Sequence, residues 1–175
     1  MMIIRQVTKR IVSAALLGFL AAATVGAQAA ESMDSAWTDP VMAPVRVLMD
    51  GLNSRVIEPV EKVMAPDATI VDEIPPFIWS GAGAHTKLMA DFSAMMKTQG
   101  IDSFVVSVTS IDQISKTDTS AYVALSAKVV SRMGDAESQE EGRFVLALVH
   151  VGNDWKIASW SWVLNAKTPV AGVQQ

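Results

Sequence analysis

The chain has 175 residues, of which 50% are hydrophobic and 18% charged, and this length suits one well-buried domain but not two. It contains no cysteine, which excludes disulfide bonds and thiolate metal sites. Beyond residue 30 it carries 11 basic and 18 acidic residues, a net charge of −7, which argues against binding to nucleic acid or to an anionic membrane surface.

Residues 1–29 show the three-part pattern of a secretory signal peptide. A basic start ends at Arg10, an apolar run covers residues 11–25, and the small residues Ala27-Gln-Ala29 form a cleavage site. The alternative is a membrane anchor, but the run is shorter than the roughly 20 apolar residues that span a bilayer. We therefore expect cleavage near Ala29 and a periplasmic or secreted mature protein without a membrane anchor.

The first part of the exported chain is expected to be helical after a flexible lead-in at residues 30–39. From Val41 to Val56 the apolar residues recur with the period of a helix, and Asp39-Pro40 supplies its start. Asn53-Ser54 ends this helix, and a second short helix is predicted up to Pro66-Asp67.

Two extended pieces and a third helix follow. β-branched residues predict a strand over 68–72, and Pro75-Pro76 forces a turn before a second extended piece at 77–79. The third helix follows Ser80-Gly81 and stops at Gly100. One of its faces carries an apolar stripe with a single histidine: His85, Leu88, Met89, Phe92 and Met96.

Everything after Ile101 has the period of a β-strand. The pattern predicts strands at about 103–114, 119–132, 138–151 and 155–164, joined by short turns. Helices followed by an antiparallel meander predict an α+β fold in which the helices cover one face of a curved sheet. The domain is expected to span residues 40–166, followed by a C-terminal tail at 167–175.

These elements, in this order, resemble the nuclear transport factor 2-like superfamily, in its SnoaL-like and ketosteroid isomerase-like branch. The resemblance rests on Met64-Ala-Pro-Asp-Ala-Thr-Ile-Val-Asp72, Trp79-Ser-Gly81 and Asp154-Trp-Lys-Ile-Ala158. It implies a cone-shaped, curved antiparallel sheet wrapped around N-terminal helices, with a pocket at the open end. Because members include isomerases, dehydratases, cyclases and proteins that only bind a ligand, the fold does not select a reaction.

Asp72 is the first candidate catalytic residue. It stands nine residues before Gly81, the register that the resemblance assigns to the proton-transferring carboxylate of the isomerases. A carboxylate at an apolar pocket wall has a raised pKa, which suits proton abstraction next to a carbonyl group. The alternative is that Asp72 or Glu73 caps the Pro75-Pro76 turn at the surface. The resemblance places the family's two oxyanion donors near Val47 and near Leu146 or Ala147, and both are missing here, which argues against ketosteroid isomerisation.

His85 is the second candidate catalytic residue, expected to face Asp72 across the pocket; the alternative is a buried structural histidine. No metal or other cofactor is expected, because a metal site would need His85, His150 and Asp72 to converge. Tyr122 could donate to a ligand or simply pack on the sheet. The expected pocket-lining residues are Val47, Phe77, Trp79, Met89, Tyr122, Ser159 and Ser161.

The last two strands are apolar on both faces, so their outer face needs a cover. Val145, Val149, Trp160 and Trp162 are expected on that face. Family members often dimerise through it, so we expect a homodimer. A bulge could instead turn Trp160 or Trp162 into the pocket.

The leading hypothesis is an exported protein that binds a small apolar organic molecule. The alternatives are an isomerase, dehydratase or cyclase that uses Asp72 with His85, and a protein-interaction module whose pocket is filled by its own side chains. An empty cavity of roughly 300 Å³ or more would exclude the last of these.

Overall fold

The computed structural model describes residues 33–168. The predicted signal peptide, the first residues of the predicted lead-in and residues 169–175 of the predicted tail lie outside the described residues. Within 33–168, no helix combines the length and hydropathy needed to cross a membrane.

The described residues form four helices: α1 (Met33–Trp37), α2 (Met42–Ser54), α3 (Ile57–Val63) and α4 (Ala84–Gln99). The last three correspond to the predicted helices. Pro44 lies in the first turn of α2. Backbone N–H groups in the first turn have no acceptor within the helix, so the N–H that proline lacks costs no helical hydrogen bond. The predicted flexible lead-in contains α1, whose Ala36 is buried.

Six strands form one sheet: β1 (Met64–Val71), β2 (Ile78–Ser80), β3 (Ser103–Lys116), β4 (Ser120–Met133), β5 (Ala136–Val151) and β6 (Asp154–Thr168). Their order in the sheet is β2-β1-β6-β5-β4-β3. All neighbours are antiparallel except β1 and β6, which are parallel. The prediction of a purely antiparallel sheet is therefore wrong at this one pairing, because the chain between β1 and β6 is long enough for a crossover.

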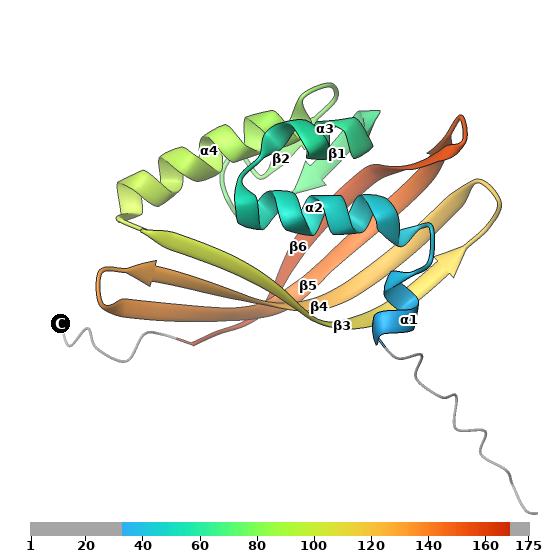
Figure 1. Cartoon of the computed structure of the whole chain (residues 1–175). Coiled ribbons are helices and arrows are strands. Elements are labelled where there is room, and N and C mark those ends of the chain that lie inside the picture. The colour runs from blue at the N-terminus through green and yellow to red at the C-terminus, as the bar shows by residue number, and fades with distance from the viewer. Residues whose placement is uncertain (1–32, 169–175) are drawn as a thin grey trace, which may run out of the picture. The chain divides into compact units, whose positions relative to one another are not determined.

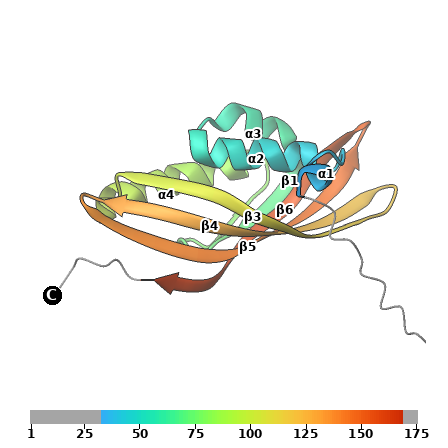
Figure 2. The ribbon, with the colours of Figure 1, turned by 60° about the horizontal axis from the view of Figure 1, so that its bottom comes forward.

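Helices α2, α3 and α4 cover one face of the strongly curved sheet, which Figures 1 and 2 show from two directions. We call this covered face the inner face and the opposite one the outer face. The core lies between helices and sheet and includes the fully buried Leu48, Ile70, Leu125 and Leu146. The predicted α+β fold with helices on one face of a curved sheet is confirmed.

Strand β6 contains two bulges that change which side chains face inward. Ala147 pairs with Ser159 but Leu148 pairs with Ile157, so Ala158 is an extra residue. Ile157 and Trp160 are consequently both buried in the core although they are three positions apart, which would place them on opposite faces of a regular strand. The second bulge of β6 lies opposite Glu141 and Gly142, where the register of its pairing with β5 shifts again.

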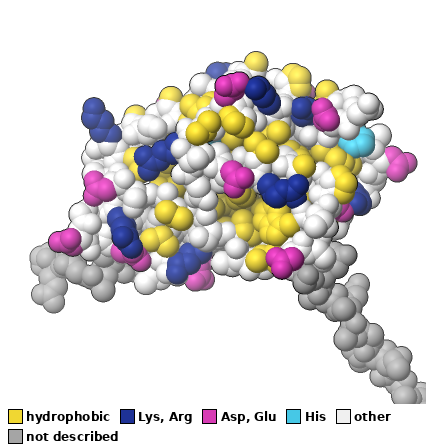
Figure 3. Space-filling view, in the orientation of Figure 1, with side chains coloured by type: hydrophobic (Ala, Val, Ile, Leu, Met, Phe, Trp, Pro, Cys, Tyr) yellow, Lys and Arg dark blue, Asp and Glu magenta, His cyan; other side chains and the backbone are white. Residues whose placement is uncertain are grey.

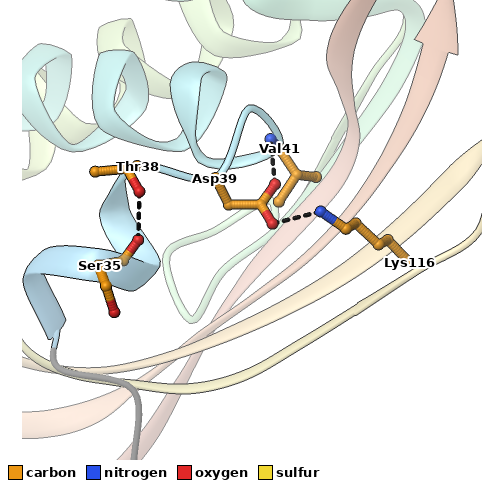
Figure 4. A network of polar contacts seen from close by, with 5 residues as sticks. All are labelled: Ser35, Thr38, Asp39, Val41 and Lys116. Carbon is orange, nitrogen blue, oxygen red and sulfur yellow. Dashed lines mark hydrogen bonds and ion pairs between the residues drawn. The ribbon is translucent and has the colours of Figure 1, made fainter.

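The start of α2 is tied to the end of β3 by the carboxylate of Asp39 (Figure 4). One oxygen accepts a hydrogen bond from the backbone N–H of Val41 at 3.0 Å, and the other forms an ion pair with Lys116. The hydrogen bond from Lys116 lowers the pKa of Asp39, an effect that burial partly opposes. This contact fastens the N-terminal helices to the sheet edge.

Side-chain hydrogen bonds link α4 to its neighbours only along the first half of the helix. Glu61 of α3 accepts hydrogen bonds from the backbone N–H and the hydroxyl of Thr86, at 2.7 and 2.8 Å. Lys87 donates to the carbonyl of Ser80, and Asp91 accepts from the indole N–H of Trp79 at 2.8 Å. Within residues 33–168, these are the side-chain hydrogen bonds that link α4 to other elements.

Candidate functional site

A cavity of about 590 Å³ lies between α4 and the inner face of the sheet. Its walls are mainly apolar, and five of the lining residues are aromatic: Phe92, Phe104, Phe144, Trp160 and Trp162. The rings pack against one another, with centroid distances of 4.7 Å for Phe92 and Phe104 and 4.8 Å for Phe144 and Trp162. The cavity exceeds the roughly 300 Å³ of a small-molecule site, so the hypothesis of a pocket filled by its own side chains is wrong.

Asp72, directly after β1, brings a carboxylate to the cavity wall. Burial raises the pKa of Asp72 above its ordinary value of 3.8. The backbone N–H of Ile74 donates a hydrogen bond to the carboxylate at 3.2 Å and opposes that rise. Asp72 thus both caps its turn, as one predicted alternative had it, and lines the cavity, as the other did.

Further charged residues line the same cavity: Glu73, Glu140 and Lys167. Glu140 and Lys167 form an ion pair at 2.6 Å, and the hydrogen bond that Lys167 donates to this carboxylate raises the pKa of Lys167. Burial raises the pKa of Glu73, with further contributions from the negative charges of Glu140 and Asp72. The cavity wall therefore carries three carboxylates against one ammonium group.

His85 does not line this cavity. It is completely buried in the first turn of α4, whereas the cavity lies against the later turns that carry Leu88 to Gln99. Burial lowers the pKa of His85, and the negative charge of Glu61 opposes this. The predicted pairing of Asp72 with His85 across one pocket is therefore wrong. On the apolar stripe of α4, His85 is buried away from the cavity, whereas Leu88, Met89 and Phe92 line it.

Of the predicted pocket residues, only Met89 lines the cavity. Tyr122, Ser159 and Ser161 lie on the outer face, since their neighbours Val123 and Trp160 are buried on the inner face. The other three are elsewhere: Trp79 is buried with its indole bound to Asp91, Phe77 lies in an exposed turn, and Val47 packs on the core from α2.

The prediction that Trp160 and Trp162 lie on the outer face is wrong, because both line the cavity. Ala158, the extra residue in β6, reverses the alternation of the residues that follow it. The bulge that the sequence left open as an alternative is therefore present. Val145 and Val149 are partly buried and lie on the outer face, opposite to the buried Phe144, Leu146 and Leu148.

Sequence reasoning missed the charged residues of the cavity other than Asp72. Glu140 shares the alternation of Phe144 along β5, so its inward position was readable from the strand pattern. Lys167 was assigned to the tail, and its contact with Glu140 depends on the second bulge of β6.

Charged side chains of both signs are interspersed with hydrophobic ones on the face seen in Figure 3. Within the described part of the chain, no group of three or more His, Asp or Glu side chains is arranged to hold a metal ion.

Neither protein-family models nor curated proteins match the sequence. Solved structures do match the fold. A hexachlorocyclohexane dehydrochlorinase, LinA type 3 from Novosphingobium barchaimii LL02, gives a TM-score of 0.66 at 12% identity, over 81% of this chain and 95% of that one.

A candidate scytalone dehydratase from Novosphingobium aromaticivorans DSM 12444 gives a TM-score of 0.61 at 14% identity, over 81% of this chain and 92% of that one. An NTF2-like protein of unknown function from Pseudomonas putida KT2440 gives 0.58 at 16% identity, over 74% and 87% of the two chains. The chain therefore has the nuclear transport factor 2-like fold that the sequence resemblance predicts.

Proposed function

We propose that this protein binds a small apolar organic molecule in the cavity between α4 and the sheet. The observation that carries this proposal is the cavity itself: about 590 Å³, with aromatic rings on its walls and a few charged groups. Ligand sites in proteins have this size and composition, because apolar walls supply affinity and a few polar groups supply orientation.

A fluorescent apolar dye tests this proposal directly. Nile red, which is uncharged, should bind the protein with one-to-one stoichiometry and shift its emission to the blue. Ser131 lines the cavity, and the neighbouring Val130 points to the opposite face of β4. Ser131→Phe should weaken dye binding at least roughly tenfold by filling the cavity, and Val130→Phe should leave it unchanged. Equal binding to both variants, or none to the wild type, would contradict the proposal.

The physiological ligand requires a separate experiment. Native mass spectrometry of the protein purified from its own host should find a small molecule bound to the wild type and absent from Ser131→Phe.

A second candidate function is a proton-transfer enzyme of the isomerase or dehydratase type, favoured by the raised pKa of Asp72 at the cavity wall. The Asp72 carboxylate would take a proton from a carbon next to an electron-withdrawing group and return it elsewhere. Two of the similar structures are named as a dehydrochlorinase and a candidate dehydratase, names that fit proton transfer. Asp72→Asn should lower turnover of any identified substrate at least about 100-fold, and Asp67→Asn, on an exposed residue, should not.

We also propose that the protein is exported and forms a homodimer. Export rests on the predicted signal peptide, and N-terminal sequencing of the mature protein should begin near Ala30. Dimerisation rests on the outer face, where Val145 and Val149 lie beside the exposed Tyr122 and Val163. Covering these side chains with a second copy removes apolar surface from water.

A further inference from the structure

The cavity carries more negative charge than its own residues neutralise. Asp72, Glu73 and Glu140 line it, and the one cation that lines it among the described residues is Lys167. Lys167 is bound to Glu140 at 2.6 Å, and within residues 33–168 neither Asp72 nor Glu73 forms an ion pair. A carboxylate that is partly buried without a counter-charge is unfavourable, because burial removes part of its hydration. The cavity therefore offers two carboxylates that a cation from outside the chain can pair with.

The three carboxylates lie close enough to act on one another. Burial is the main cause that raises the pKa of Asp72 and that of Glu73, and the negative charge of Glu140 adds to both shifts. The positive charge of Lys167 opposes the shift only weakly, and only at Glu73. A cation between such groups replaces their repulsion with attraction, whereas an anion adds to the repulsion. This part of the cavity thus favours a positively charged group of a ligand.

Asp72 lies next to an aromatic residue of the same wall. In the parallel pairing of β1 with β6, Val71 pairs with Ser161. The next residues along the two strands are Asp72 and Trp162, and both line the cavity. Neighbouring strands are about 4.8 Å apart, so a cation bound by this carboxylate is within reach of the indole ring. Tryptophan is the side chain whose ring attracts cations most strongly.

The remaining walls define the rest of the ligand. The cavity measures about 590 Å³, and Phe92, Phe104 and Phe144 contribute further aromatic surface. A small inorganic ion would leave this volume unfilled, and among the described residues no three acidic or histidine side chains are arranged to hold a metal. An ammonium group joined to a bulky apolar body matches both the charged and the apolar parts of the wall.

We propose that the cavity binds a protonated apolar amine, whose ammonium group pairs with Asp72 beside Trp162 and whose body contacts the aromatic walls. This inference rests on the proposed function, because it names the class of molecule that the cavity binds. The Asp72 carboxylate accepts a hydrogen bond from the backbone N–H of Ile74 at 3.2 Å. Two carboxylate oxygens accept about four hydrogen bonds, so acceptor capacity remains for the ammonium group.

Displacement of Nile red tests the preference for a cation. The two probes are diphenylmethylamine, which is protonated at pH 7, and diphenylmethanol, which has the same apolar body and no charge. The amine should displace the dye from the full-length wild type at a lower concentration than the alcohol. This preference should fall at least roughly tenfold in Asp72→Asn, the value of one hydrogen bond between charged groups.

Asp67→Asn is the matched control. It removes the same charge from an exposed position of β1 that does not line the cavity, so the preference for the amine should remain. Because Nile red is uncharged, its binding to Asp72→Asn shows whether the cavity of the variant is intact.

A second measurement uses only the wild type. The amine keeps its charge between pH 7 and pH 4, whereas the carboxylate of Asp72, whose pKa is raised above 3.8, takes up a proton as the pH falls. The affinity for the amine should therefore fall towards pH 4, while the affinity for the alcohol should change less.

The results separate this inference from the proposed function. Equal displacement by the two probes, displacement by neither, or a preference that Asp72→Asn retains would overturn the inference, and dye binding would still support the proposed function. A preference that is the same at pH 7 and pH 4 would overturn the inference too. Failure of Nile red to bind the wild type would overturn both.

Discussion

Gly142 on β5 makes room for the indole of Trp162, which forms part of the cavity wall. A Cβ atom at position 142 would lie 2.6 and 2.7 Å from two ring atoms of Trp162 and 2.5 Å from the carbonyl oxygen of Val163. Ordinary contacts begin at 3.4 Å, so the substitution Gly142→Ala demands a displacement of about 0.9 Å in a paired strand. Overpacking of this kind costs about 1–3 kcal/mol, which corresponds to a fall in melting temperature of roughly 3–10 °C.

Thermal unfolding followed by circular dichroism measures this effect. Glu141→Ala, at the exposed neighbouring position, is the matched control and should change the free energy of unfolding by no more than about 0.5 kcal/mol.

A double-mutant cycle isolates the contact between position 142 and the indole of Trp162. Trp162→Phe removes the two ring atoms that meet the new Cβ, so Gly142→Ala should cost at least about 0.5 kcal/mol less in that background. The residual cost comes from the carbonyl of Val163. Strictly additive effects, or a Gly142→Ala protein as stable as the wild type, would refute the packing of Trp162 over Gly142.

Three other predictions concern Asp72, Asp39 and the outer face. The pKa of Asp72 is raised above 3.8 in the folded state, so between pH 3.8 and that raised pKa the folded protein binds more protons than the unfolded chain. The free energy of unfolding therefore falls as the pH rises through this range. Asp72→Asn should therefore be more stable than the wild type in urea unfolding at pH 7, but not at pH 3. Asp39 has a lowered pKa, so its ion pair with Lys116 stabilises the fold above pH 3.8 and is lost as pH falls through the pKa of the folded state. Asp39→Asn, which retains an oxygen for the cap, should cost about 0.5 kcal/mol at pH 7 and nothing at pH 2. In sedimentation at micromolar concentration, the wild type should be a dimer and the Val145→Lys, Val149→Lys double variant a monomer; a monomeric wild type would refute this interface.

The elements of the fold were predictable because the apolar residues repeat with the periods of helix and strand. The stripe from Leu88 to Met96 predicts α4, and the alternation around Phe144 predicts β5. Both patterns reflect which side chains of a single element are buried, so they can be read from the sequence without knowing which other elements pack against it.

The candidate site was predicted only for Met89, which the helical stripe indicates, and for Asp72, which the register of the family resemblance indicates. Asp72 and Met89 were placed at the cavity, but Trp160 and Trp162 were assigned to the wrong face. A bulge adds one residue without changing composition, and Ala158 has no local feature that marks it. The contact between Glu140 and Lys167 depends on the pairing of β5 with β6, which the sequence predicts only in outline.

The side-chain hydrogen bonds between α4 and the other described elements are confined to its first half, and this has a consequence for ligand binding in the cavity. Hydrogen bonds donated by Thr86 and Lys87 and accepted by Asp91 hold the first half of the helix, whereas Met95 and Gln99 line the cavity from the second half. That half is held by apolar contacts, which have no preferred direction, and methionine side chains adapt to different shapes. We therefore expect the second half of α4 to shift more readily than the first half when a ligand fills the cavity, because such a shift need not break any of these hydrogen bonds.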